Sequence, residues 1–233
     1  MIVSGGIQVT VPTRTGEKMV SLTVENYVKA IYQLAQPEQA VATGQISAAL
    51  GVLPGTVTSM LKTLDDSKLA TYTPYEGVRL TESGRGLALR VLRRHRLIER
   101  FLVETLELSW DEVHDEAENM EHAVSDWLVD RIDVKLGFPS TDPHGDPIPK
   151  ADGTMATTTD RRLADCRPGE PFHVSRVTDQ SPDFLRFLSQ AGLEIGATGS
   201  LVANEPADDG VTVSIAGSNR KLSRETAGKL LVR

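Results

Sequence analysis

The chain has 233 residues, which is enough for one large domain or for two to three small ones. No apolar run is long enough to cross a bilayer, and residues 1–20 lack the continuous apolar core of a signal peptide. The single cysteine, Cys166, excludes an intramolecular disulfide and a CxxC zinc site. We therefore expect a cytoplasmic protein in a reducing compartment.

The net charge of −7 is unevenly distributed along the chain. Residues 43–100 carry nine Lys and Arg against five Asp and Glu, a balance of +4, whereas residues 101–233 carry −11. A basic N-terminal half and an acidic C-terminal half are typical of a protein that binds phosphates with its N-terminal part and has its other functions in the remainder of the chain.

The first elements along the chain have the order of a winged helix-turn-helix. Helical periodicity predicts helices over 21–36, 43–52 and 53–69, the second capped by Thr43. Alternating residues over 69–81 predict a two-stranded hairpin. Helix, short helix, turn, helix and hairpin together make a DNA-binding fold.

In such a motif the second helix enters the major groove, and its N-terminal residues face base edges. Here these residues are Pro54, Gly55, Thr56, Thr58 and Ser59. Their hydroxyls can bond bases or phosphates, and a threonine methyl can contact a thymine methyl, while Lys62 would hold a phosphate. The alternative is helix capping and ordinary surface polarity. The agreement of motif, hairpin and local charge favours DNA contact.

The stretch "VHDEAENMEH" (113–122) holds two of the five histidines and four carboxylates. It lies in a helical pattern running from about 109 to 136, where residues four apart share a face. A stripe on that face comprises His114, Glu118, Glu121 and His122, and His95 and Glu99 are also four apart on the helix that begins near Thr81. Alone, such pairs often only stabilise an exposed helix face. Two such helices packed together predict a metal site.

These segments resemble the diphtheria toxin repressor family of metal-dependent transcriptional repressors. The resemblance runs from Leu22 to about Pro149 and includes "ENYVKAIYQL", "HRLIERFL", "VHDEA", the "EH" at Glu121–His122 and "PHGDPIP". A weaker likeness, in "GLEIGATGSLV", points to the small SH3-like domain of longer members.

The resemblance implies a mainly α fold with a small C-terminal β-barrel. We expect five regions: a flexible N-terminal extension (1–20), a winged helix-turn-helix domain (21–88), a helical dimerisation and metal-binding domain (89–138), a Pro/Gly-rich linker (139–165) and an SH3-like domain (166–233). The role of the last domain stays open between supplying a metal ligand, stabilising the helices and binding a partner peptide.

The resemblance also implies two metal sites per subunit. The first would use Asn26, Glu118, Glu121 and His122, and the second His95, Glu99 and His114 with one ligand from the C-terminal domain. Candidates for that ligand are Asp179, Gln180 and Asp183, of which we prefer Asp183. Lys29 cannot ligate a metal as an ammonium ion.

Two departures from the family pattern bear on the metal. Iron-sensing members carry sulfur where this chain has Glu118 and Asn26, so oxygen donors here favour Mn²⁺ over Fe²⁺, which remains an alternative. Manganese-sensing members usually carry an acid at the Asn26 position, so Asn26 would offer a carbonyl oxygen or nothing.

The expected function is a repressor, not an enzyme, that binds operator DNA as a homodimer when loaded with metal and controls genes of metal homeostasis. Two alternatives remain: a metal-dependent hydrolase that uses the His/Glu cluster, and a metal-independent winged-helix regulator. Histidine ligation predicts weak operator binding below about pH 6, where histidines protonate.

Overall fold

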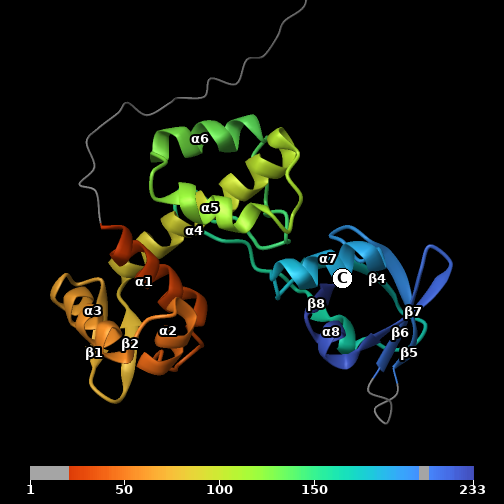
Figure 1. Cartoon of the computed structure of the whole chain (residues 1–233), viewed down its shortest axis with the longest axis horizontal. Coiled ribbons are helices and arrows are strands. Elements are labelled where there is room, and N and C mark those ends of the chain that lie inside the picture. The colour runs from red at the N-terminus through yellow and green to blue at the C-terminus, as the bar shows by residue number, and fades with distance from the viewer. Residues whose placement is uncertain (1–20, 205–209) are drawn as a thin grey trace, which may run out of the picture.

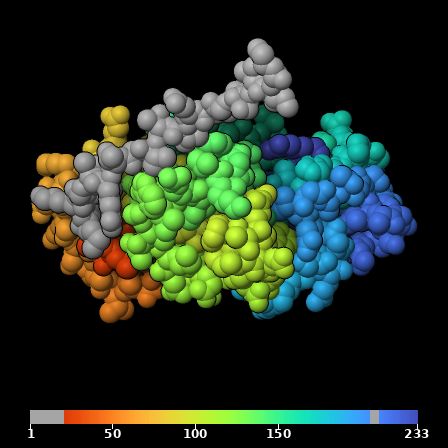
Figure 2. Space-filling view, turned by 90° about the horizontal axis from the view of Figure 1, so that it is seen from above, coloured from red at the N-terminus to blue at the C-terminus, as the bar shows by residue number. Residues whose placement is uncertain are grey.

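The computed structural model describes residues 21–204 and 210–233 (Figure 1). Three domains follow one another along the chain, and the space-filling view shows the helical middle domain between the N-terminal and C-terminal domains (Figure 2). The predicted flexible extension, residues 1–20, lies outside the described residues. Within the part of the chain that is described, no helix has the length and apolar character that membrane crossing requires.

The N-terminal domain is the predicted winged helix-turn-helix. Its elements are α1 (Leu22–Leu34), α2 (Thr43–Leu50), α3 (Pro54–Asp66), β1 (Ala70–Thr73) and β2 (Gly77–Leu80). The antiparallel hairpin β1–β2 is extended by a bridge between Val41 and Val78. Buried Val28, Ile31 and Leu61 belong to one apolar core beneath the three helices. The prediction of Thr43 as a cap is wrong, because Ala42 occupies the N-cap position of α2.

The middle domain contains α4 (Glu82–Leu106), α5 (Val113–Glu121) and α6 (Asp126–Lys135). Helix α4 starts at the wing and continues into this domain, so the boundary expected at 88/89 falls within one continuous helix (Figure 1). The prediction of a single helix over 109–136 is wrong. The chain leaves the helix after Glu121, and the Ser125 side chain caps α6 by accepting from the Leu128 N–H.

The C-terminal domain is a small antiparallel sheet with short helices. Its elements are β3 (Arg161–Arg162), the 3₁₀ turn η1 (Leu163–Asp165), β4 (Pro171–Val177), α7 (Pro182–Ala191), β5 (Thr198–Asn204), β6 (Gly210–Ile215), β7 (Ser218–Ser223), α8 (Arg224–Gly228) and β8 (Leu230–Val232). The strand order is β3-β8-β4-β5-β6-β7. Leu185 and Leu188 of α7 pack into the same core as the strands. The predicted SH3-like barrel is confirmed.

The C-terminal domain contacts the middle domain through Trp110 and the linker. The Trp110 indole N–H donates to Ser189 Oγ at 3.0 Å, and the Trp110 carbonyl oxygen lies 2.8 Å from His144 Nε2. The Val177 N–H donates to the His144 carbonyl oxygen at 3.0 Å. His144 therefore lies where the linker, the middle domain and β4 meet.

Candidate metal centre and DNA-binding face

Three predicted ligands meet at the end of α5. Glu118, Glu121 and His122 each offer a ligand atom within 4.8 Å of the others, and we call them the first cluster. Glu121 is fully buried, because α5 packs this face against α4, where Ala117 and Ile98 share a core. The predicted helical spacing of these residues is thus realised, with His122 at the C-cap of α5.

The orientation of His122 is fixed from α1. Its Nδ1 lies 2.6 Å from Glu25 Oε2, so the Nδ1–H donates to this carboxylate, which Arg94 holds in turn at 3.2 Å. The other nitrogen, Nε2, is buried without a hydrogen bond, although Glu121 Oε1 is only 3.1 Å away. A histidine with one N–H held by a carboxylate presents its second nitrogen as a metal ligand.

Lys29 reaches the first cluster from α1. Its ammonium bonds Glu118 Oε1 and, at 2.6 Å, Glu121 Oε1. The second oxygen of Glu121 bonds His95 Nδ1 at 2.7 Å. Burial alone would lower the pKa of His95, but hydrogen bonds to Glu121 and Glu99 raise it to about 9. Two cations, Lys29 and His95, thus face the carboxylate of Glu121.

Glu99 connects the predicted second site with a histidine from the linker. Its Oε1 lies 3.0 Å from His95 Nε2 and 3.3 Å from His114 Nδ1, while its Oε2 lies 3.7 Å from His144 Nδ1. Burial raises the pKa of Glu99, but the three neighbouring histidines outweigh it and hold the pKa well below the usual range. The predicted set of His95, Glu99 and His114 is therefore brought together.

A second cluster, which the sequence did not predict, comprises Glu99, Asp142 and His144. All three are buried and their ligand atoms lie within 4.8 Å of one another. Nε2 of His144 faces the Trp110 carbonyl oxygen and must donate to it, which leaves Nδ1 buried without a hydrogen-bond partner. An unpaired buried nitrogen beside two carboxylates is typical of a metal ligand.

The charge at the second cluster also favours a cation. Burial and the neighbouring Glu99 and Asp146 raise the pKa of Asp142 to about 7. The charges of His144 and of Arg96, whose Nε lies 3.6 Å from Asp142 Oδ2, only partly offset these carboxylates. A divalent ion would stabilise the charged form of Asp142.

The two remaining predicted ligands have different surroundings. The Asn26 side-chain oxygen is buried and has no hydrogen-bond partner, so it stays a candidate ligand. Asp183 is 97% exposed at its side chain and pairs with Arg186, which also bonds Asp111. Asp183 is absent from the clusters found among the described residues, so the structure does not support our preference for it.

The predicted DNA-reading residues lie at the N-terminal end of α3. Pro54, Gly55, Thr56, Ser59 and Lys62 are exposed, and Thr58 is half-buried. Thr58 and Ser59 donate their hydroxyls to the carbonyl oxygens one turn earlier, of Pro54 and Gly55. Their lone pairs remain able to accept hydrogen bonds from base amino groups.

Large apolar residues on this face were not predicted. Leu53, the N-cap residue of α3, is 76% exposed, and Tyr75 at the tip of the hairpin is fully exposed. The sequence pattern that could have revealed them is an apolar residue directly before Pro54 and another within the turn of the hairpin. Exposed apolar groups beside base-reading residues suit contacts with thymine methyls or sugar edges.

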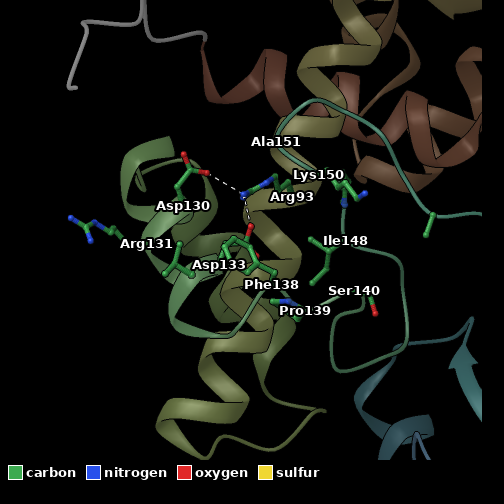
Figure 3. Close-up of a pocket in the computed structure, with 13 residues that line it drawn as sticks. Arg93, Asp130, Arg131, Asp133, Phe138, Pro139, Ser140, Ile148, Lys150 and Ala151 are labelled. Carbon is green, nitrogen blue, oxygen red and sulfur yellow. Dashed lines mark hydrogen bonds and ion pairs between the residues drawn. The ribbon is translucent and has the colours of Figure 1, made fainter. Parts of the chain in front are cut away.

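One cavity is separate from the clusters. It has a volume of about 810 Å³ and lies between α6 and the linker, with Phe138 and Ile148 on its walls (Figure 3). Arg93 projects into this region from α4 and bonds Asp130 at 3.1 Å and Asp133 at 2.7 Å. No histidine lines the cavity, so the His/Glu clusters do not face a substrate-sized pocket there.

Comparisons with known proteins agree with this arrangement. Family models described as the iron dependent repressor N-terminal DNA binding domain, the iron dependent repressor metal binding and dimerisation domain, and the FeoA domain match residues 19–78, 81–150 and 161–233. The iron-dependent repressor IdeR of Mycobacterium leprae strain TN is 30% identical over 177 residues, which are 72% of this chain and 77% of that protein.

Solved structures extend the likeness to the whole fold. A manganese-dependent transcriptional repressor in complex with manganese is 39% identical, with a TM-score of 0.82, covering 90% of this chain and 98% of that one. ScaR with bound Zn²⁺ is 31% identical, with a TM-score of 0.74 and the same coverage. On the combined basis of domain order, clustered ligands and these matches, the chain belongs to the diphtheria toxin repressor family of metal-dependent transcriptional repressors.

Proposed function

We propose that this repressor binds operator DNA as a homodimer when loaded with Mn²⁺, with Fe²⁺ as the alternative ion, and controls genes of metal homeostasis. The observation that carries the proposal is the position of the first cluster. Its donors Glu118, Glu121 and His122 lie on α5 and at its C-cap. Glu25 and Lys29, which contact them, belong to α1 of the DNA-binding domain.

The side chains of the first cluster suit a divalent ion. The unbonded Nε2 of His122 and the unbonded oxygen of Asn26 supply two buried donor atoms without partners. With the carboxylates of Glu118 and Glu121, the set would be three oxygens and one nitrogen, without sulfur. Such a donor set favours Mn²⁺ over softer ions. Bound there, the ion would neutralise the carboxylates and tie α1 to α5.

We place a second ion at Glu99, Asp142 and His144. The three side chains are buried, and the free Nδ1 of His144 is directed by the bond between Nε2 and the Trp110 carbonyl oxygen. His95 and His114 bond the same Glu99 from its other side. This site joins α4 to the linker and so to the C-terminal domain, for which it suggests a stabilising role.

Metal would act by linkage. An ion that uses donors from α1 and α5 binds most tightly when both helices are correctly placed, so it favours that arrangement by its differential affinity. If the arrangement also sets the two α3 helices of a dimer about 34 Å apart, one turn of DNA, metal and DNA must strengthen each other's binding.

The two alternative functions, a metal-dependent hydrolase and a metal-independent regulator, predict different features of the structure. A hydrolase needs a substrate cavity beside its metal, whereas the 810 Å³ cavity is lined by other residues, so we expect no turnover of phosphoesters with Mn²⁺. A metal-independent regulator would have donors that are satisfied by one another, whereas His122 and His144 each keep one buried nitrogen without a hydrogen bond. As a DNA-binding regulator, the protein would act in the cytoplasm.

The test is selection of genomic DNA fragments on the purified protein with Mn²⁺, with anaerobic Fe²⁺ and with chelator. Retention of specific fragments only with metal would support the proposal and rank the two ions. Retention that is equal with chelator would refute metal control. The variant Lys62→Ala tests the DNA-binding face. It should bind all fragments more weakly, and the salt dependence of its affinity should fall by the contribution of about one phosphate contact.

A further inference from the structure

Lys29 is a buried cation inside the first cluster. Only 7% of its surface is exposed, and its ammonium bonds the carboxylates of Glu118 and Glu121. Lysine is among the residues least often buried, and it is buried only when paired. Here the ammonium comes from α1 and its partners come from α5, so the ion pair spans the same two helices that the metal is proposed to join.

The oxygens that a metal would use are already bonded. Oε1 of Glu121 bonds Lys29 at 2.6 Å, and Oε2 of Glu121 bonds His95 at 2.7 Å. The same ammonium bonds Oε1 of Glu118. Oε1 of Glu121 is also the oxygen that faces the unbonded Nε2 of His122, at 3.1 Å. An ion coordinated by Glu121 and His122 on this side must therefore take Oε1 from Lys29, because two cations cannot share it at contact distance without strong repulsion.

We propose that Lys29 is a tethered competitor of the metal, which sets the concentration at which the first cluster loads. This inference rests on the proposed function of that cluster. Lys29 carries one positive charge and bonds two carboxylates, whereas a divalent ion carries two charges and gains the unbonded Nε2 of His122 as an additional donor. The ion displaces the ammonium only when its free concentration is high enough to outweigh this intramolecular ion pair.

The same contact gives Lys29 a second effect. Without a cation between them, Glu118 and Glu121 would repel each other on one face of α5. The ammonium neutralises part of that charge and holds α1 close to α5. Removal of the charge thus has two separable consequences: the metal-free protein loses stability, and the metal meets no competitor.

The experiment is calorimetric titration of Mn²⁺ into the full-length wild type, Lys29→Gln, Lys29→Met and the control Lys135→Gln, which removes a charge from the exposed face of α6. We expect both Lys29 variants to bind Mn²⁺ about tenfold more tightly. We also expect them to melt at a lower temperature in chelator and to retain DNA at lower Mn²⁺. Lys135→Gln should match the wild type in each measurement.

The outcomes separate this inference from the function on which it rests. A Lys29 variant that folds, by circular dichroism, and binds Mn²⁺ no more tightly than the wild type overturns the competitor role. A purely structural role would lower the melting temperature and leave or weaken the affinity, so tighter binding excludes it. If the wild type takes up no stoichiometric Mn²⁺, the proposed metal site itself fails, and the inference fails with it.

Discussion

The first and second clusters use the same kinds of side chain, yet they differ in what they connect and in the charge around them. The first cluster joins α5 to α1 and is bonded by the ammonium of Lys29. The side chain of Glu118 in this cluster is 36% exposed. The second joins α4 to the linker and is entirely buried, and Asp142 within it is faced by His144 and by Arg96, whose Nε lies 3.6 Å from Asp142 Oδ2. A partly open site with a built-in competitor suits reversible sensing, whereas a fully buried site suits an ion retained for stability.

The largest expected effect follows from removal of Glu121, the residue on which Lys29, His95 and His122 all converge. Glu121→Gln should weaken Mn²⁺ binding at the first cluster by more than about a hundredfold and abolish metal-dependent DNA binding, because a neutral amide is a poor ligand. Calorimetry and fragment retention measure both. Glu116→Gln, on the exposed face of the same helix, is the control and should bind like the wild type. An unchanged affinity in Glu121→Gln would remove the first cluster from the mechanism.

A smaller loss is expected from Glu25→Gln. This carboxylate accepts the His122 Nδ1–H at 2.6 Å and so directs Nε2 toward Glu121. Partners of this kind contribute about ten- to a hundredfold to metal affinity. Mn²⁺ titration should show a loss in that range, while Glu38→Gln, at an exposed position, should show none. Equal affinity in the two variants would mean that Glu25 does not orient His122.

The affinity for Mn²⁺ should depend on pH over a higher range than the sequence predicted. The pKa of His95 is raised to about 9, so its positive charge opposes a metal at Glu121 throughout the neutral range. The affinity for Mn²⁺ should therefore rise up to about tenfold per pH unit between pH 7 and 9, instead of levelling off above pH 6.

The stability of the metal-free protein has the opposite dependence on pH. A raised histidine pKa contributes stability that is complete below about pH 6.5 and is lost as the pH rises through about 9. Calorimetry across this range tests the first statement, and denaturant unfolding in chelator tests the second.

The smallest effect on DNA binding is expected from His144→Gln. The loss of its Nδ1 should remove one bound ion per subunit and lower the melting temperature, because the second cluster then loses its only nitrogen donor. Metal-dependent DNA binding should change by no more than a few-fold, since the first cluster remains intact. The control is His173→Gln, an exposed histidine on β4. Loss of DNA binding on the scale of Glu121→Gln would show that the two clusters are not functionally distinct.

Much of the fold was predictable because local signals and global packing agree. The periodicity that predicted the helices of the N-terminal domain is the spacing of core residues such as Val28, Ile31 and Leu61. The break between α5 and α6 was missed, because apolar residues continue at helical spacing across His122–Ser125 while the capping Ser125 interrupts the backbone.

The proximity of the candidate ligands was predictable where they share a helix face, as with Glu118 and Glu121. It was not predictable where the ligands depend on a loop. Asp142 and His144 stand two residues apart in a segment that resembled a linker, and only the fold brings them beside Glu99. We excluded Lys29 as a ligand because an ammonium cannot coordinate a metal, but periodicity could not show that this ammonium would bond two of the predicted ligands.

The central claim is that metal at the first cluster and DNA at α3 are linked. The most direct test is titration of Mn²⁺ into the wild-type protein alone and in its complex with a selected DNA fragment, at one salt concentration. We predict that DNA tightens Mn²⁺ binding by the same factor by which Mn²⁺ tightens DNA binding, because the coupling free energy is reciprocal. Equal Mn²⁺ affinity with and without DNA would contradict the account, since the ion could not then control the arrangement that binds the operator.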